Sequence, residues 1–279
     1  MKFQNPYPEM TFPNTAQCIL SHPDGTNRTI RAAVFQEHRT AFYYWLQWNN
    51  KRILELKKAK KRKKQPILIT IDWHQDLCHP NEDALHEFSN SDITDVSLAV
   101  QFTLMKLNPS NDDHVVAAAK LNLISDVYVI CKQAMGLNGW EDEEIIDFYG
   151  ANHRIRKFRS FEDASDAIIV LDENELYFDI DLDYFVKDGP LNGNASDFSY
   201  YGPEEIQKML DPKSKFMSWI LDRMQGFTIA TEPEHCGGLK YSNELLNIID
   251  QLFFTPTLLM ENRIDWNKST KWKHLLDLI

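Results

Sequence analysis

The sequence predicts a three-layer α/β protein, in which a mainly parallel sheet lies between two layers of helices. Short apolar runs such as ILITI at 67–71 alternate along the chain with stretches of helical periodicity. Strands that alternate with helices favour a parallel sheet covered on both faces. No internal repeat or low-complexity linker marks a boundary, and 279 residues with 43% hydrophobic content can bury one core. One domain over residues 1–279 is therefore expected.

The N-terminal part is expected to form a hairpin, a long helix and a strand. A Pro-Asp-Gly turn at 23–25 separates two apolar runs, which predicts a hairpin over 17–35. Apolar residues at helical spacing follow from Arg39 to about Lys64, where the helix becomes strongly basic. Pro66 stops this helix and opens the strand ILITI.

The rest of the chain continues the alternation. Helices are expected at 82–107, 112–122, 141–149, 203–224 and 241–254, and strands at 126–130, 153–158, 168–171, 175–183 and 227–232. Open α/β sheets bind ligands beyond the carboxyl ends of their strands. Polar residues that end the strands at 66–71, 175–181 and 227–232 are therefore expected to meet in one crevice.

Composition and charge narrow the classes of function. The formal net charge of -11 argues against a nucleic-acid binder, which needs a basic surface. The chain has no run of about 18 apolar residues and no apolar signal segment, so neither a membrane span nor secretion is expected. The four cysteines have no paired spacing, which indicates neither a disulfide framework nor a cysteine zinc site. We expect a cytoplasmic protein, and its oligomeric state is left open.

The stretch DWHQD places Asp72, His74 and Asp76 directly after a predicted strand. Alternate residues of an extended segment project to the same side, so the three side chains are able to face one metal ion. An Asp or His after a strand is also a common helix cap or turn residue. This motif alone leaves both interpretations open.

A second motif repeats the spacing of the first. Asp179, Asp181 and Asp183 end the apolar strand ELYFDIDLD. Carboxylates on one side of a strand repel one another unless a cation compensates them. Oxygen and imidazole ligands without thiolates suit hard or borderline divalent ions such as Mn²⁺, and this many carboxylates suit two ions that share bridging ligands. Two such ions can hold a hydroxide nucleophile at neutral pH.

These motifs resemble those of a known group of enzymes. DWHQD is similar to the DAHxD motif of the arginase and ureohydrolase superfamily, FDIDLD is similar to its SxDxD motif, and ATEPEH resembles its late strand that ends in a glutamate. The set Glu37-His38, DWHQD, DIDLDYF and EPEHCGG more closely resembles the UPF0489 family. That family includes peptide arginases, which convert arginine side chains of ribosomal peptides to ornithine. The resemblance spans about residues 30–240 and implies an arginase-like fold.

The resemblance also implies roles for individual residues. It makes Asp72 and Asp179 the bridging ligands of two Mn²⁺ ions, with the remaining ligands divided into the pairs His74 with Asp181 and His38 with Asp76. The same ligands would accept Fe²⁺, Co²⁺ or Zn²⁺. Asp76 would pass a proton to the leaving amine, and a histidine that shuttles protons is expected, either His79 or His86. Glu232 would pair with the substrate guanidinium, supported by Glu234 or His235.

The sequence departs from the superfamily pattern in three places. Gln36-Glu37-His38-Arg39-Thr40 stands where GGDHS is usual around the first histidine ligand. Asp183 has no counterpart role; we group it with the residues that bind substrate, and the alternative is a residue that orients a metal ligand. Leu77, Cys78 and His79 replace the polar residues that grip a free amino acid. The absence of those polar residues favours, as substrate, an arginine side chain that is part of a peptide.

The chain has one basic block, and two other functions are considered. The lysine-rich run 57–64 is either a solvated helix end or a docking site for an acidic leader of a precursor peptide. The first rival function is a ureohydrolase or a deacetylase-like hydrolase, acting on another guanidino compound or on an amide. The second rival is a non-catalytic interaction protein with a structural metal site.

Overall fold

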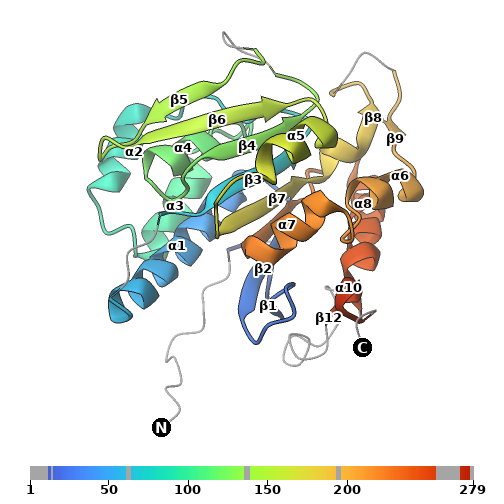
Figure 1. The fold of residues 1–279 in the computed structure, drawn as a ribbon. Coiled ribbons are helices and arrows are strands. Elements are labelled where there is room, and N and C mark those ends of the chain that lie inside the picture. Colours follow the sequence, from blue (N-terminus) through green and yellow to red (C-terminus); the bar gives the residue numbers. More distant parts are fainter. Residues whose placement is uncertain are drawn as a thin grey trace.

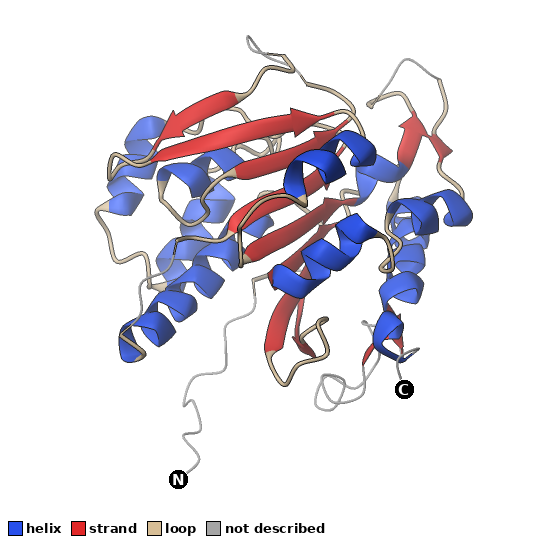
Figure 2. Cartoon of the chain, in the orientation of Figure 1, coloured by secondary structure: helices blue, strands red, loops and turns tan. Residues whose placement is uncertain are grey.

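A single eight-stranded sheet crosses the molecule, with strand order β1-β2-β10-β7-β3-β4-β6-β5 (Figure 1). The six inner strands pair in parallel, and the edge strands β1 and β5 are antiparallel to their neighbours. Helices cover both faces (Figure 2). The predicted three-layer α/β fold is confirmed. This computed structural model describes residues 12–13, 15–60, 64–134, 139–192, 196–255 and 271–276.

The strands of the sheet are short, and the central ones are buried throughout. Their bounds are β1 Ala16–Ser21, β2 Thr29–Phe35, β3 Ile67–Asp72, β4 Val127–Cys131, β5 Glu143–Ile146, β6 Asn152–Phe158, β7 Leu176–Asp181 and β10 Met224–Ala230. Two small ribbons pair β8 (Val186–Asp188) with β9 (Ser199–Tyr200), and β11 (Phe254–Thr255) with β12 (Lys271–Trp272). Every residue of β3, β4 and β7 is buried, which explains their continuous apolar sequences.

The helices divide into two layers that follow two hydrophobic clusters. One layer holds α1 Thr40–Lys58, α2 Glu82–Ser89, α3 Val96–Met105 and α4 His114–Lys120. The other holds α5 Phe161–Ile168, α6 Pro203–Met209, α7 Lys215–Arg223 and α8 Leu239–Phe253. A 3₁₀ turn, η1 (Leu182–Phe185), follows β7, and α10 (Lys273–Leu276) lies near the C-terminus. Among the described residues, no helix is long and apolar enough to cross a bilayer.

Two predicted elements have the wrong type. The acidic stretch predicted as a helix at 141–149 forms strand β5, which pairs antiparallel with β6 and alternates between buried and exposed side chains. Pairing with a neighbouring strand here overrides helix propensity. The strand predicted at 168–171 is instead the end of α5 and the turn after it. That helix starts where the Ser160 side chain accepts a hydrogen bond from the Asp163 amide.

Three predicted helices are shorter than expected. The helix from Arg39 ends at Lys58, and Lys60 has a positive φ of 53°. The stretch 82–107 is divided into α2 and α3 because Asp95 caps a new helix through the amides of Ser97 and Leu98. The stretch 203–224 is divided in the same way into α6 and α7, where the Ser214 side chain accepts from the Met217 amide.

Candidate metal centre

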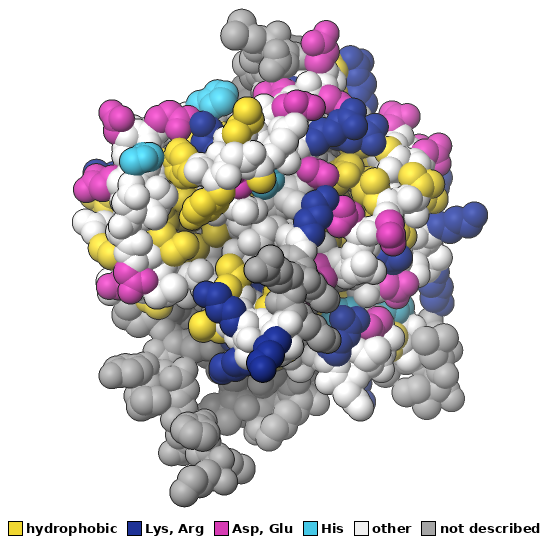
Figure 3. Space-filling model, turned by 60° about the vertical axis from the view of Figure 1, so that its left-hand side comes forward, with side chains coloured by type: hydrophobic (Ala, Val, Ile, Leu, Met, Phe, Trp, Pro, Cys, Tyr) yellow, Lys and Arg dark blue, Asp and Glu magenta, His cyan; other side chains and the backbone are white. Residues whose placement is uncertain are grey.

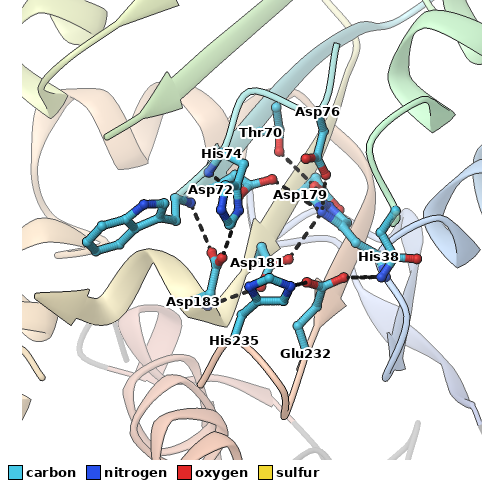
Figure 4. A network of polar contacts seen from close by, with 12 residues as sticks. His38, Thr70, Asp72, His74, Asp76, Asp179, Asp181, Asp183, Glu232 and His235 are labelled. Carbon is cyan, nitrogen blue, oxygen red and sulfur yellow. Dashed lines mark hydrogen bonds and ion pairs between the residues drawn. The ribbon is translucent and has the colours of Figure 1, made fainter. Parts of the chain in front are cut away.

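The carboxyl ends of four neighbouring strands meet at one edge of the sheet and present the predicted polar residues there (Figure 4). Asp72 ends β3, Asp181 ends β7, Glu232 follows β10, and His38 follows β2. In the register, Ile71 pairs with Ile180 and Ala230 pairs with Asp181. Asp72 and Asp181 therefore lie at the same level.

His38 lies at the centre of the carboxylates. Its Nδ1 atom is 2.9 Å from Asp76 Oδ2, 3.2 Å from Asp181 Oδ2 and 3.3 Å from Asp72 Oδ2. Its Nε2 atom is 2.7 Å from Asp179 Oδ2. His38, Asp72 and Asp181 each offer a ligand atom within 4.8 Å of the others. The position of His38, which departs from the superfamily sequence, is therefore suited to a metal ligand.

A second group of ligands lies beside the first. His74 Nδ1 is 3.2 Å from Asp183 Oδ2, and the His74 amide donates a 2.7 Å hydrogen bond to Asp72 Oδ1. The Trp73 amide donates to the other oxygen of Asp183, at 2.9 Å. Asp72, His74 and Asp76 also offer ligand atoms within 4.8 Å of one another. The alternation predicted from DWHQD thus brings its polar side chains together.

Asp179, expected to be a bridging ligand, lies below this level. It pairs in register with Thr70 and Thr228 on the neighbouring strands, and both hydroxyl groups donate hydrogen bonds to its carboxylate. It belongs to none of the groups of described residues that are able to hold a metal ion. The register of β7 sets Asp181, and not Asp179, level with Asp72.

Buried negative charge dominates the centre. Burial raises the pKa of the Asp76 and Asp181 carboxyl groups well above the usual value, and the charges of Asp72 and Asp183, respectively, raise it further. Burial lowers the pKa of His38, but the nearby carboxylates, Asp179 first, outweigh it and raise the pKa well above its usual value. Among the described residues, the ion-pair partners of these carboxylates are histidines. A buried cluster of this charge calls for a cation.

Two buried atoms lack hydrogen-bond partners, which tests whether a cation fits. His38 Nδ1 and Asp183 Oδ2 are both buried, and neither makes a hydrogen bond with the described residues. Buried polar atoms are normally satisfied, so each orphan needs an explanation. His38 Nδ1 faces carboxylate oxygens, and Asp183 Oδ2 faces the His74 ring, as atoms that bind a shared metal ion would. The imidazole and carboxylate set therefore fits a divalent ion.

Glu232 lies beside the ligands in a strained backbone conformation with φ of 27°. Its Oε1 atom accepts hydrogen bonds from the His38 amide at 3.1 Å and from Asn111 Nδ2 at 2.5 Å. Burial raises the pKa of its carboxyl group to about 7. Strain of this kind is typical of functional sites, and here it turns the carboxylate toward the ligand groups.

Several residues of the centre line a cavity of about 260 Å³, a volume suited to a side chain or a small molecule. Its lining residues are His74, Gln75, Asp76, Leu77, Cys78, Ser110, Asn111, Asp112, Gln133, Asp181, Glu232 and His235. The lining is acidic, and no Lys or Arg belongs to the part of it that the structure describes. A positively charged ligand is therefore favoured.

Some predicted site residues lie away from this cavity. His79, His86 and Glu234 are exposed and do not line it, so the structure supports neither histidine as the shuttle. The His86 ring instead contacts the Phe148 ring, and its backbone and ring bond to Asn90. No pattern in the sequence linked these two histidines to the strand ends.

Other residues of the site were missed by the sequence analysis. His114 is fully buried, with its ring centroid 4.4 Å from that of His38. Its Nδ1 atom is 2.9 Å from the carbonyl oxygen of Asn111, the residue that holds Glu232. Asn192 holds His235 in a similar way. These residues stand alone in the sequence, and only the three-residue spacing of Asn111 and His114 at a helix start hinted at a shared role.

The chain matches no protein-family model and no curated protein. The chemistry of the centre is therefore argued from its own residues. Its imidazoles and carboxylates are able to hold divalent cations, and its acidic cavity is able to accept a cationic group.

Proposed function

We propose that the protein is a dinuclear metal hydrolase that converts arginine side chains within a peptide to ornithine and urea. The observation that carries the proposal is the meeting of two ligand groups at Asp72, beside Glu232 and the same acidic cavity. A cationic side chain that enters the cavity would reach both the ligands and a carboxylate. The order of the motifs along the chain, which resembles that of the arginase superfamily, supports the same reaction.

The geometry suggests how the ligands are shared between two ions. His38 and Asp76 would serve the first ion and His74 and Asp183 the second, while Asp72 and Asp181 would serve both. Two Mn²⁺ ions, or Fe²⁺, Co²⁺ or Zn²⁺ in their place, would supply an activated water as nucleophile for the guanidinium carbon. Asp179 would keep the inner end of the site in place through Thr70 and Thr228.

Glu232 is suited to hold the guanidinium group. Its Oε1 atom is already held by Asn111 and by the His38 amide, while Oε2, which is 3.9 Å from His235 Nε2, would bind the substrate. A guanidinium forms strong charge-assisted hydrogen bonds with a carboxylate. Asp76, which lines the cavity beside the ligands, would pass the proton to the leaving amine.

The cavity lining favours a peptide over free arginine. A free amino acid brings an α-carboxylate, which a Lys or Arg would bind most strongly, and the described lining contains neither, although its neutral side chains include Gln75, Ser110, Asn111 and Gln133. Asp112 in the same lining would repel that carboxylate. Leu77 and Cys78 line the cavity where a free amino acid would need a polar grip. An arginine whose α-groups are in peptide bonds avoids both problems.

The lysine-rich run remains the proposed docking site for an acidic leader segment. Lys57, Lys58 and Lys60 are exposed, and α1 ends within the run. Lys64 is 2.7 Å from Glu173 and 3.5 Å from Asp126, so it is already paired. Residues 61–63 lie outside the described part of the chain. On the face drawn in Figure 3, acidic and basic side chains are interspersed, so a leader would be held by this local run rather than by a broad basic surface.

The test is urea release by the Mn²⁺-loaded protein, with an arginine-containing peptide and free arginine offered side by side. Urea and an ornithine-containing product from the peptide, both lost in Asp181→Asn, would support the proposal. Equal rates with free arginine would contradict the argument from the cavity lining and leave the chemistry intact. No urea from either substrate would move the assignment to a deacetylase-like or non-catalytic protein, and release of acetate from acetylated peptides would distinguish those two.

A further inference from the structure

We propose that His235 is an additional ligand of the second metal position, so that the imidazoles of His74 and His235 both bind the second ion. This inference deepens the proposed dinuclear centre and rests on it. No pattern in the sequence suggests it, because His235 comes from the loop after β10, whereas His74 follows β3. The presence of this ligand would affect which metal ion the second position prefers and the affinity with which that ion binds.

The first observation is the convergence of the ligand atoms. His74, Asp183 and His235 each offer a ligand atom within 4.8 Å of the others. The two imidazole rings lie edge to face, with centroids 5.3 Å apart. Figure 4 shows the His235 ring beside Glu232, facing the carboxylates that end β7. Three elements far apart in sequence therefore bring ligands to one point.

The second observation is the unsatisfied oxygen of Asp183. This residue is 0% exposed, and its Oδ1 atom accepts the hydrogen bond from the Trp73 amide. Its Oδ2 atom makes no hydrogen bond and lies 3.2 Å from His74 Nδ1. A buried carboxylate oxygen without a hydrogen-bond donor is costly, and a metal ion between Asp183 and the imidazoles would satisfy it.

The third observation is that the Asn192 side chain forms hydrogen bonds with His235. Asn192 Nδ2 donates a 2.7 Å hydrogen bond to the His235 carbonyl oxygen, which turns Oδ1 of the same amide toward the ring. Oδ1 lies 2.9 Å from His235 Nδ1. Because an amide oxygen only accepts, Nδ1 carries the hydrogen and Nε2 keeps its lone pair. Histidines that bind metals are usually held in this way through their second ring nitrogen.

The two metal positions would then differ in exposure. The first lies among buried side chains, because His38 and the carboxylates around it are buried and buried His114 also offers a ligand atom within 4.8 Å of His38 and Asp76. The second has two imidazoles whose side chains are 28% and 31% exposed at the cavity. Imidazole ligands favour Co²⁺, Fe²⁺ or Zn²⁺ over Mn²⁺. Because these two imidazoles are partly exposed, the second ion is expected to be the more exchangeable one, and Co²⁺ is expected to bind there.

The test is a titration of the metal-free protein with Co²⁺, followed by the visible absorption of the bound ion and by equilibrium dialysis. We expect two ions per chain in the wild type. His235→Ala should weaken the second binding event by more than about tenfold and change its absorption, while the first event stays as it was. Asn192→Ala, which keeps the imidazole but removes its support, should weaken the second event less. Circular dichroism checks that each variant is folded.

His79→Ala is the matched control, because it removes another nearby imidazole that does not line the cavity. It should bind both ions as the wild type does. An unchanged second affinity and spectrum in folded His235→Ala would overturn the inference. The proposed reaction fails separately, in the urea assay, if the wild type binds two ions and releases no urea from any arginine-containing peptide.

Discussion

Asp72 and Asp181 end adjacent parallel strands at the same level, and their Oδ2 atoms lie 3.3 Å and 3.2 Å from the same atom, His38 Nδ1. Asp179, two residues earlier on β7, accepts hydrogen bonds from Thr70 and Thr228 and lies 2.7 Å from the other ring nitrogen of His38. Alternation along one strand thus gives these two aspartates different surroundings. Asp181 faces other carboxylates, and Asp179 is held by hydroxyl groups.

This difference predicts opposite behaviour for two matched substitutions. Asp181→Asn removes a shared ligand, so we expect loss of at least one bound ion and a fall in urea release of roughly a thousandfold or more. Asp179→Asn removes no member of the ligand groups, so we expect both ions to bind at saturating metal, the first more weakly because His38 loses its carboxylate partner. It should also lower the thermal midpoint, since buried hydrogen bonds are disturbed. Metal analysis and thermal denaturation measure the two effects. Loss of metal in Asp179→Asn alone would restore the bridging role first expected for it.

Glu232→Gln is expected to affect substrate binding and leave the metal content unchanged. The substitution keeps the shape of the side chain and removes the charge that would pair with a guanidinium. Losing a charge-assisted hydrogen bond costs about 1.5–3 kcal/mol, or roughly ten- to a hundredfold in kcat/KM. Asn111→Ala should show a smaller loss, because it removes one hydrogen bond to Oε1 of Glu232 and leaves the carboxylate charge and the bond from the His38 amide. Steady-state kinetics with an arginine peptide test both, and an unchanged kcat/KM in Glu232→Gln would rule out this role.

The metal-free protein is expected to become less stable as the pH rises. The pKa values of His38, Asp76 and Asp181 are raised well above their usual values, and that of Glu232 is raised to about 7. Groups with raised pKa values hold extra protons in the folded state, so their stabilisation is present at low pH and lost as the pH rises through the folded pKa. His114 shifts the other way and opposes them in part.

The measurement is the thermal midpoint of the metal-free protein between about pH 5.5 and 8, with and without Mn²⁺. We expect the midpoint to fall across this range without metal. Mn²⁺ should raise it more at pH 8 than at pH 5.5, because metal and protons compete for the same ligands. A midpoint that rises with pH in the absence of metal would show that the buried carboxylates are not the protonated groups. Chelation should reverse the effect of Mn²⁺.

Charge reversal in the basic run tests the docking of an acidic leader. Lys57→Glu, Lys58→Glu and Lys60→Glu together should raise the KM for a full precursor peptide with an acidic leader and leave a short arginine peptide unaffected. These side chains are exposed, so the fold should tolerate the changes. Equal effects on both peptides would contradict docking at this run. Reversal of Lys271 and Lys273, away from the run, is the control.

Local sequence patterns predicted most of the fold, and they failed where pairing with a neighbouring strand decides the secondary structure. Continuous apolar runs identify β3 and β7 because these strands are buried on both faces. Residues 143–146 carry an acidic sequence that suits a helix, yet they pair with β6 at the edge of the sheet. Such a choice depends on a partner strand that no local pattern reveals.

The sequence by itself determined the fold class, because strand periodicity is a local property, and it predicted metal-dependent chemistry from alternating ligands. It identified Asp72, His74 and Asp76 as one group of ligands. Only the tertiary structure decided between Asp179 and Asp181, because that depends on how β7 is aligned with its neighbours. It also brought His114, His235 and Asn192 to the site and left His79 and His86 outside. Those positions depend on contacts between segments far apart in the chain, which one sequence does not record.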